Sequence, residues 1–375
     1  MAEPRKIVLI LGNGFDLDLG YKTSYKDFWE SEYCPKDYPA PIIYHLNQRW
    51  KDGLDAVKWY DLENELLSYY RQLKDPHIGA DFLTEEEKKF LQNFESYRFL
   101  YRQYDDKIDI INSLIDKGVL SSNGYQLYWS CEDNHQKEDC AQSPIWRDKK
   151  ALRLIKDGLC SYIKNIDLQS KKDNTVALNV LFAANCAREV GNFLSVYSFN
   201  YTKLPVDYGD GFINTVHYVH GTCEKGKIII GTKDDDFVKS YDFLQKSFNP
   251  DFNPPAIVAD LLDADEVIIF GHSIGENDSQ YFKAFFKQQV DVTHPKKKDI
   301  YIFTRDEESK VEIKRSLQKM TDNNLSNLCC LNHVPIIRTS KLGEDFGFID
   351  EFFSKHISDK THLRFTLKQI KELIA

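Results

Sequence analysis

Four short polar motifs each follow an apolar run in this sequence, and they carry the side chains best suited to bind a ligand or catalyse a reaction. The motif "GNGFD" supplies backbone N–H groups and a carboxylate, whereas "FNYT" supplies the amide of Asn200. The motif "YVHGT" supplies the imidazole of His220, and "FGHSIGEND" supplies Ser273 and Asp278. An amide both donates and accepts hydrogen bonds, and an imidazole can take up a proton near neutral pH. The four motifs therefore combine an anion-binding turn, an orienting group and a base.

The first motif is a glycine turn at the end of an apolar segment, because residues 6–11 run straight into Gly12-Asn13-Gly14. A strand that turns on Gly-x-Gly into a helix exposes backbone N–H groups that favour an anion, usually a phosphate. We therefore expect the N–H groups from Gly12 to Phe15 to hold a pyrophosphate, with a plain tight turn as the alternative. The dinucleotide fingerprint also needs a glycine where this chain has Leu17. An ordinary Rossmann dehydrogenase therefore fits poorly.

The other three motifs end apolar runs that are typical of buried parallel strands. In open α/β sheets, ligands bind at the carboxyl ends of the strands. We therefore expect polar groups from all four motifs to line one pocket at that edge. The expected pocket residues are Gly12, Asn13, Gly14, Asp16, Asn200, His220 and Ser273.

Several of these side chains also have structural interpretations. Asp16 can accept a hydrogen bond from a ligand hydroxyl or cap a helix. Ser273 and Asp278 suit the adenosine side of a nucleotide pocket, although Asp278 also suits a helix cap. His217 should point to the opposite face of its strand from His220, because successive strand residues alternate between faces. We expect His217 to be structural.

We expect no metal. Cys131, His135 and Cys140 form the one Cys/His cluster of the sequence, and their spacing differs from that of a zinc ribbon. The adjacent carboxylates in "GTKDDDF" (231–237) have no neighbouring histidine and indicate a solvated turn.

The elements that would position these groups alternate between strands and helices. Short Val- and Ile-rich runs bounded by Gly, Asn or Asp predict one mainly parallel sheet, and helical periodicity at 256–262 and 306–320 predicts an α/β, Rossmann-like layer sandwich. The strands are expected at 6–11, 193–199, 216–220, 227–230, 266–270, 299–303 and 334–337.

The middle of the chain has a different periodicity. Its apolar residues recur at helical spacing, which predicts a large helical insertion lobe at 41–190, with a polar loop over 121–143. The Rossmann-like domain would then comprise 1–40 and 191–345. The tail, 346–375, is expected to form two amphipathic helices.

Composition excludes several classes of protein. The chain has 375 residues, of which 42% are hydrophobic and 29% charged, so a globular fold is expected and disorder is not. No apolar run is long enough to span a membrane, and the N-terminus has no signal-peptide pattern. The net charge of −9 disfavours binding to nucleic acid. Eight scattered cysteines suit reduced thiols, and we expect a cytoplasmic protein.

The motifs together resemble a known family. The stretches "LGNGFDLDLGYKTSYKDF", "FNYT", "YVHGT" and "FGHSIGENDSQYF" are similar, in order and spacing, to those of the AbiH family. AbiH proteins are bacterial proteins associated with abortive infection, a defence against phage. The resemblance covers most of the chain.

A more distant resemblance links these motifs to the sirtuin-like (SIR2-like) NAD-binding fold. Gly12, Gly14 and Gly20 match the glycines of the sirtuin Gly-Ala-Gly-x-Ser…Gly-x-Pro loop, with Asn13, Asp16 and Lys22 in place of its Ala, Ser and Pro. In this alignment Asn200 and Thr202 stand at the Asn and Asp of the Asn-x-Asp motif, and His220 stands at the catalytic histidine. The resemblance implies NAD as a substrate, with Asn200 and His220 as catalytic residues.

One departure from the sirtuin pattern narrows the expected activity. No Cys-x-x-Cys pair occurs in the chain, so the zinc module of sirtuin deacylases is missing and protein deacylation is disfavoured. Sirtuin-like defence effectors also lack that module and hydrolyse NAD. We therefore expect an NAD+ hydrolase that cleaves the nicotinamide–ribose bond. The alternatives are a non-catalytic nucleotide-binding sensor and, third, a nucleotide transferase. A phage-derived trigger and a homo-oligomer are further expected partners.

Overall fold

The chain folds into two compact units in the computed structural model. The sheet unit comprises Met1–Thr23, Ile163–Ile228 and Asn253–Ala375, and the helical unit comprises Ser24–Tyr162 and Ile229–Phe252. These units group the chain differently from the segments expected from sequence, because residues 24–40 and 229–252 fall in the helical unit. The structure describes residues 3–53, 61–73, 83–92, 107–117, 119–120, 144–166, 172, 175–205, 215–234, 238, 241–293 and 296–357.

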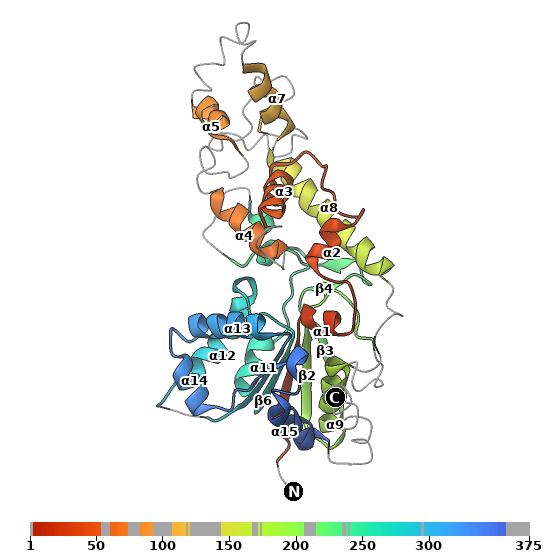
Figure 1. Cartoon of the computed structure of the whole chain (residues 1–375), viewed down its shortest axis with the longest axis vertical. Helices are drawn as coiled ribbons and strands as arrows, with labels where there is room; N and C mark the ends of the chain where they lie inside the picture. Colours follow the sequence, from red (N-terminus) through yellow and green to blue (C-terminus); the bar gives the residue numbers. More distant parts are fainter. Residues whose placement is uncertain are drawn as a thin grey trace. The chain divides into compact units, whose positions relative to one another are not determined.

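The sheet unit is built on six parallel strands in the order β3-β2-β1-β6-β7-β8 (Figure 1). This confirms the α/β, mainly parallel fold expected from sequence. The central strands are apolar on both faces, as parallel strands covered by helices on both sides must be. The strands are β1 (Lys6–Leu11), β2 (Phe193–Ser198), β3 (Val216–Tyr218), β6 (Glu266–Phe270), β7 (Asp299–Thr304) and β8 (Ile336–Arg338).

The direction in which the chain adds strands reverses once. From β1 it moves outward through β2 to β3, and then returns to place β6 on the other side of β1, followed by β7 and β8. The reversal therefore lies between β1 and β6. In doubly wound sheets, ligands bind at the carboxyl ends of the strands beside such a reversal.

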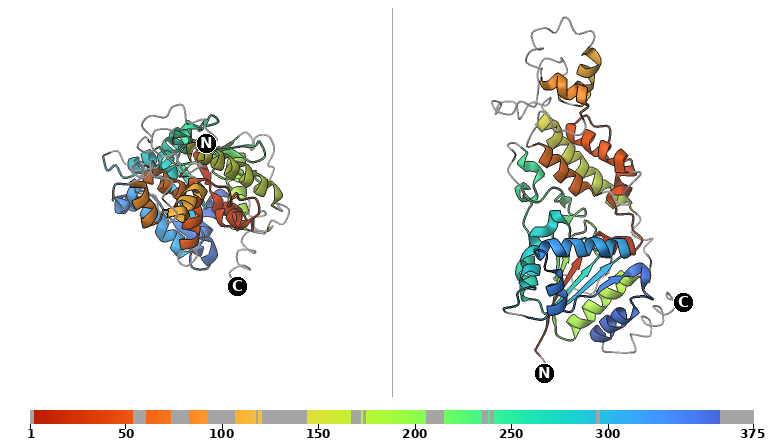
Figure 2. Two further views of the ribbon diagram at one scale, coloured as in Figure 1. Left: turned by 90° about the horizontal axis from the view of Figure 1, so that it is seen from above. Right: turned by 60° about the vertical axis from the view of Figure 1, so that its left-hand side comes forward.

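Helices cover both faces of the sheet (Figure 2). Alternate residues of β1 supply the two cores, since Leu9 and Leu11 pack on one side and Val8 and Ile10 on the other. The first core is completed by α9 (Val176–Glu189) and α15 (Phe346–His356), and by Phe15 of α1 (Asn13–Asp18). The second core is completed by α11 (Ile257–Asp263), α12 (Ser279–Gln288), α13 (Glu307–Met320) and α14 (Leu325–Leu331).

One expected strand does not belong to the main sheet. Residues 227–230 were expected in it, but β5 (Lys227–Ile228) instead pairs antiparallel with β4 (Gly221–Thr222) in a separate hairpin. A parallel partner would need a crossover of about a dozen residues or more, and the chain between β3 and β5 is too short for one. Gly226, at φ +66°, lies in the turn that joins the two strands of the hairpin.

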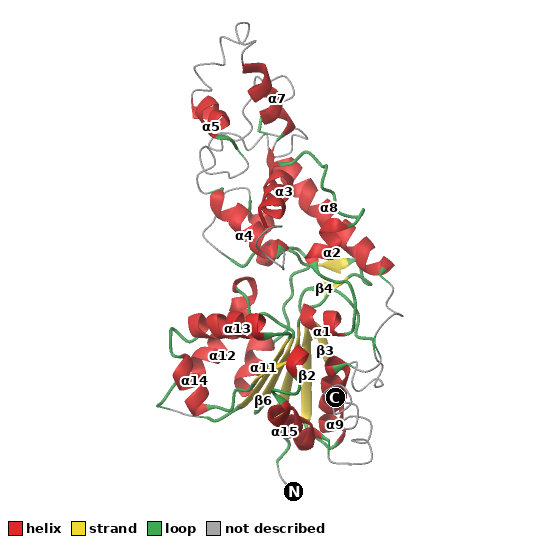
Figure 3. Cartoon of the chain, in the orientation of Figure 1, coloured by secondary structure: helices red, strands yellow, loops and turns green. Residues whose placement is uncertain are grey.

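The described part of the helical unit is mainly helical, as expected, while the main strands gather in the sheet unit (Figure 3). The described residues include no helix with the length and hydrophobicity to cross a membrane. The expected Cys131–His135–Cys140 cluster, the loop over 121–143 and the second tail helix lie outside the described residues. The helices of this unit are α2 (Tyr25–Glu30), α3 (Pro41–Gly53), α4 (Leu62–Gln72), α5 (Glu85–Gln92), α7 (Ile108–Asp116) and most of α8 (Pro144–Asn165).

Candidate functional site

The glycine turn after β1 is locked to the turn after β6. The N–H of Gly12 donates to the carbonyl of Phe270 (2.9 Å), and the N–H of Gly14 donates to the carbonyl of Gly271 (2.8 Å). The N–H of Phe15 donates back to the carbonyl of Gly12 (2.9 Å). Three of the four amides expected to hold a pyrophosphate are therefore already bonded to the chain itself. The expectation of an amide cradle is corrected accordingly.

The glycines of this turn serve close packing of backbone on backbone. A Cβ added at Gly14 would lie 2.6 Å from the Cα of Gly271, and one added at Gly12 would lie 2.5 Å from the Cα of His272. Gly271 has φ +64° and its own Cβ would meet Gly14 at 2.5 Å. These positions cannot carry a side chain without moving a strand end. The turn draws the ends of β1 and β6 together at the reversal of the sheet.

The other residues of the first motif have distinct places. The Asn13 side-chain oxygen accepts from the hydroxyl of Thr23 (2.6 Å). Phe15 is fully buried and packs edge-on against Phe270, with 5.9 Å between the ring centroids. Phe15 is therefore a core residue. Asp16 lies inside α1, whose N-cap is Gly12, so Asp16 does not cap this helix.

The carboxylate of Asp16 joins the first and second motifs. Its Oδ1 accepts from Nδ2 of Asn200 (3.1 Å), and its Oδ2 accepts from the hydroxyl of Thr202 (2.6 Å). All three side chains are buried. Burial raises the pKa of Asp16 to about 7, although the bonds from Thr202 and Asn200 oppose that rise. Asp16 can therefore hold or release a proton near neutral pH.

Asn200 keeps one strong hydrogen-bonding atom unused. Its side chain is buried, and its Oδ1 has no hydrogen-bond partner among the described residues. Buried polar atoms nearly always have a partner, so an unsatisfied amide oxygen at the carboxyl end of β2 marks a place where a ligand donor fits.

A second polar group forms around Asp278. Its Oδ1 lies 3.3 Å from Nε2 of His220, and its Oδ2 lies 3.5 Å from Nε2 of His272. Asp278 precedes α12, but its side chain makes no capping bond to that helix. Asp278 occupies the N-cap position, as the capping alternative expected, but its side chain contacts His220 and His272. Asp278 lies beside the expected catalytic histidine, where it can orient and stabilise an imidazolium.

His272 is a member of this group that sequence reasoning missed. Its Nδ1 accepts from the N–H of Ile274 (2.9 Å), so in the neutral ring the proton is on Nε2, which faces Asp278. Ile274 is buried at φ +51°, an uncommon backbone conformation for a β-branched residue. Strain of this kind concentrates at functional sites. The "GHS" that follows β6 was the available signal.

Two consecutive residues connect the two groups. Phe199 packs edge-on against His220 and His272, with ring centroids 5.3 Å and 4.4 Å apart, respectively. The next residue, Asn200, contacts Asp16. Side chains from the ends of β1, β2, β3 and β6 are thereby brought to one edge of the sheet. That all the expected residues line a single pocket remains a prediction.

Comparison with known proteins decides the family. The family model described as "Bacteriophage abortive infection AbiH" matches residues 8–294, which include all four motifs. This chain belongs to the AbiH family. Searches of curated proteins and of solved structures give no match.

Two further expected positions in this AbiH chain are peripheral. The side chain of Ser273 is exposed, whereas its neighbour His272 is buried. His217 is exposed and its ring stacks on Tyr197, with 5.2 Å between the centroids. His217 therefore makes a structural contact. His217 and His220 do not lie on opposite faces as expected, because Tyr197 and Phe199, on which they pack, belong to the same core. Of the "GTKDDDF" carboxylates, Asp234 accepts from Ser247, and the others lie outside the described residues.

The helical unit of the AbiH chain has its own buried carboxylate. Asp148 accepts from the hydroxyls of Tyr69 (2.6 Å) and Tyr241 (3.2 Å) and from the N–H of Ile42 (2.9 Å). Burial raises the pKa of Asp148 to about 7, against these three bonds. The contacts tie α3, α4 and α8 to the segment around Tyr241. Because Asp148 is wholly buried and surrounded by its own partners, its place is structural.

Proposed function

We propose that this AbiH-family protein is an NAD+ hydrolase that acts in abortive infection by cleaving the bond between nicotinamide and ribose. Family membership indicates the role in defence against phage. The hydrolase activity is inferred from the site. The observation that carries it is the Oδ1 of Asn200, which is buried without a hydrogen-bond partner among the described residues, together with the His220–Asp278 pair at the same edge of the sheet. Nucleotides bind at this edge in this fold class.

The reaction consumes one water. Water adds to the anomeric carbon of the ribose, the carbon–nitrogen bond breaks, and its electron pair neutralises the nicotinamide ring. The products are ADP-ribose, nicotinamide and one proton. The ribose develops positive charge on the way, so the enzyme must hold the ribose hydroxyls and admit a single positioned nucleophile.

The chain's own residues supply the acid–base steps. His220 accepts a proton from the water or from a ribose hydroxyl, and Asp278 stabilises the imidazolium that results. Oδ1 of Asn200 accepts a hydrogen bond from the same hydroxyl or water. The glycine turn has a different part from the one expected: it brings the two strand ends together, and its bonded amides leave the pyrophosphate to other contacts.

The decisive test measures free nicotinamide after purified protein is incubated with NAD+. We expect His220→Ala to lower the rate by about 10²- to 10⁴-fold, the usual contribution of a positioned base, while NAD+ binding is retained. Asn200→Ala should also slow the reaction, and its loss should not add to that of His220→Ala if the two act as a unit. His217→Ala is the matched control, because this histidine is exposed and its ring stacks on Tyr197.

The same measurement separates the hydrolase from a nucleotide sensor. In phage-infected cells, wild-type protein should deplete NAD+ and the His220→Ala protein should not. Binding of NAD+ without nicotinamide release, both in vitro and during infection, would establish the sensor and reject the hydrolase.

A further inference from the structure

The amide of Asn200 can face its surroundings in two ways, and Asp16 allows only one of them. An ionised carboxylate is an acceptor at both oxygens, so the atom of Asn200 that lies 3.1 Å from Asp16 must be the donor, Nδ2. The amide oxygen is then turned away from Asp16. That oxygen is buried and has no partner among the described residues.

We infer that Asp16 is a positioning residue that fixes the Asn200 amide with its oxygen toward the ligand, so that the site accepts a hydrogen-bond donor and rejects an acceptor. The chemical class of the ligand group is a hydroxyl or a water. Its identification as a nicotinamide-ribose hydroxyl or as the attacking water rests on the proposed hydrolase.

The arrangement holds in both protonation states of Asp16. When Asp16 is ionised, Nδ2 of Asn200 and the hydroxyl of Thr202 both donate to it. When Asp16 is protonated on Oδ2, its Oδ1 remains an acceptor for Nδ2 of Asn200. The Thr202 hydroxyl, which can donate or accept, then accepts that proton. The amide of Asn200 keeps one orientation throughout.

This chemistry predicts which replacements of Asp16 work. In Asp16→Asn, the new amide oxygen can accept from Asn200 while the new amide nitrogen donates to Thr202. In Asp16→Leu, which is similar in size and apolar, Nδ2 of Asn200 loses its acceptor and the amide is free to turn over. Asp16→Ser is a second loss variant, because its hydroxyl is too short to reach Asn200.

The kinetic test compares these variants on NAD+. Asp16→Leu and Asp16→Ser should lower kcat/KM by about 10²-fold, the loss expected when a reacting group is misplaced. Asp16→Asn should recover most of that loss. The matched control is Asp18→Leu, in the same helix: Asp18 accepts from the N–H of Ala177 on α9, so its loss should lower stability and leave kcat unchanged. If Asp16→Asn is as slow as Asp16→Leu, Asp16 acts through its charge and the inference is overturned.

Two measurements test the inference separately from turnover. In protein labelled with ¹⁵N at asparagine, the side-chain NH₂ of Asn200 should show one downfield, exchange-protected proton in the wild type and in Asp16→Asn, and neither feature in Asp16→Leu. Unchanged resonances in Asp16→Leu would overturn the inference even if NAD+ is never cleaved. Failure of the wild type to bind or cleave NAD+, with the expected resonances present, would reject the proposed function and leave the orientation of Asn200 established.

The ligand's polarity is tested with fluorinated analogues of NAD+. Replacing one nicotinamide-ribose hydroxyl by fluorine, in turn at the 2′ and 3′ positions, removes the donor and keeps an acceptor. One of the two analogues should bind the wild type at least tenfold more weakly than NAD+ does. The affinity of that analogue should fall little further in Asn200→Ala, because this variant has no amide oxygen to accept a hydrogen bond. If both analogues bind the wild type as tightly as NAD+ does, a ribose hydroxyl is excluded as the donor. If Asn200→Ala also cleaves NAD+ at the wild-type rate, water is excluded too, and the donor-selective site is overturned.

Discussion

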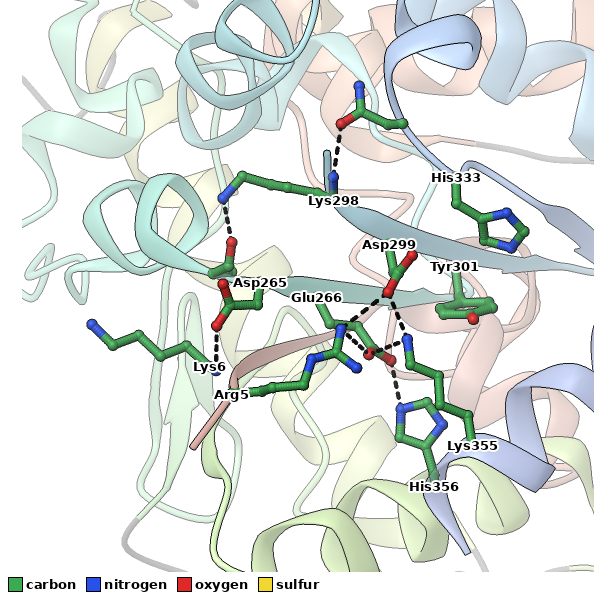
Figure 4. Close-up of polar contacts among 12 residues, drawn as sticks. Arg5, Lys6, Asp265, Glu266, Lys298, Asp299, Tyr301, His333, Lys355 and His356 are labelled. Carbon is green, nitrogen blue, oxygen red and sulfur yellow. Dashed lines mark hydrogen bonds and ion pairs between the residues drawn. The ribbon is translucent and has the colours of Figure 1, made fainter. Parts of the chain in front are cut away.

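A buried carboxylate lies near each end of the sheet, and the two carboxylates differ in the charge of their partners. Near the carboxyl ends of the strands, the partners of Asp16 among the described residues are the neutral donors Asn200 and Thr202. At the amino end of β6, Glu266 is fully buried among cations (Figure 4). Its oxygens lie 2.5 Å from Nε2 of His356, 2.7 Å from the amine of Lys355 and 3.1 Å from the guanidinium of Arg5.

The pKa values of the two carboxylates diverge for this reason. Burial alone would raise the pKa of Glu266, but the hydrogen bond and charge of His356, with Lys355, hold that pKa below its usual value. Burial raises the pKa of Asp16 to about 7, and the hydrogen bonds that oppose this rise come from the neutral side chains of Thr202 and Asn200. A buried charge stabilises the structure only while its ion pairs are kept. A carboxylate whose pKa lies near neutral pH is suited to a functional site.

The cations around Glu266 also anchor α15. Lys355 and His356 lie in the last turn of this helix, where the helix dipole favours positive charge. His356 reaches Glu266 with Nε2, and its Nδ1 lies 2.6 Å from the carbonyl of Phe352. Asp299 of β7 shares the same cations, accepting from Arg5 (3.0 Å) and Lys355 (2.7 Å). The amino end of the sheet is thus held together by ion pairs among four segments distant in sequence: Arg5, β6, β7 and α15.

The largest effect is expected from removing the charge of Glu266. Glu266→Gln leaves His356, Lys355 and Arg5 around a neutral group, and breaking a buried ion pair costs about 3–5 kcal/mol. We expect a loss near the lower end, about 3 kcal/mol, because Arg5 and Lys355 are partly exposed. Urea unfolding measures it. Asp16→Asn should cost far less, and an equal loss in the two variants would remove the distinction between the two ends.

The pH dependence of stability should separate the two carboxylates. A lowered pKa means that the contribution of Glu266 is present above its unfolded pKa, near 4.5, and is lost as the pH falls through the folded value. A raised pKa means that the contribution of Asp16 is present below its unfolded pKa, near 3.8, and is lost as the pH rises through about 7. Each pKa unit is worth about 1.4 kcal/mol.

Variants assign these two limbs of the stability curve. Glu266→Gln should flatten the limb below pH 4.5, and Asp16→Asn should reduce the slope between pH 3.8 and about 7. Asp148 titrates in the same window as Asp16, so the slope falls only in part, and the difference from wild type is the quantity to measure. An unchanged slope in Asp16→Asn would contradict the raised pKa of Asp16.

The smallest effect is expected from His272→Phe, which sharpens the comparison within the candidate site. Phenylalanine can keep the edge-on packing with Phe199 but cannot accept from the N–H of Ile274 or donate to Asp278. Loss of such bonds costs about 1 kcal/mol each, measurable by thermal unfolding. Nicotinamide release should fall about tenfold, less than in His220→Ala, because a positioned base alone contributes more. A rate equal to wild type would assign His272 to the fold alone.

Sequence patterns predicted more of the fold than of the candidate site. β1 and β6 could be predicted because they are buried on both faces and bounded by glycine, a local pattern. The place of β5 in a separate hairpin could not be predicted, because a strand of two residues has the same sequence pattern as the end of a buried strand. The pairing of Asp16 with Asn200 joins residues far apart in sequence, and so does that of Glu266 with His356. Only the folded chain shows which buried acid meets a cation.

The candidate site residues likewise divide into those that were predicted from the sequence and those that were not. His220 and Asn200 were predicted from their places at strand ends, whereas Asp278 was predicted to lie on the adenosine side and instead contacts His220. His272 carried no signal beyond standing after β6, because its role depends on the turn at Ile274. The glycines were expected to bring backbone amides to a phosphate, with a plain tight turn as the alternative, and in the structure they pack against another strand end.

The packing of the turn after β1 against the turn after β6 also determines when, during synthesis, the site can form. Gly14 is made at the start of synthesis, but the backbone that it packs against, Gly271, leaves the ribosome only after most of the chain has been translated. At about 5–20 residues per second, the wait is on the order of tens of seconds. A nascent or truncated chain that ends before β6 therefore cannot assemble this edge of the sheet. A cell that makes the protein therefore holds this edge of the sheet only in copies synthesised past β6.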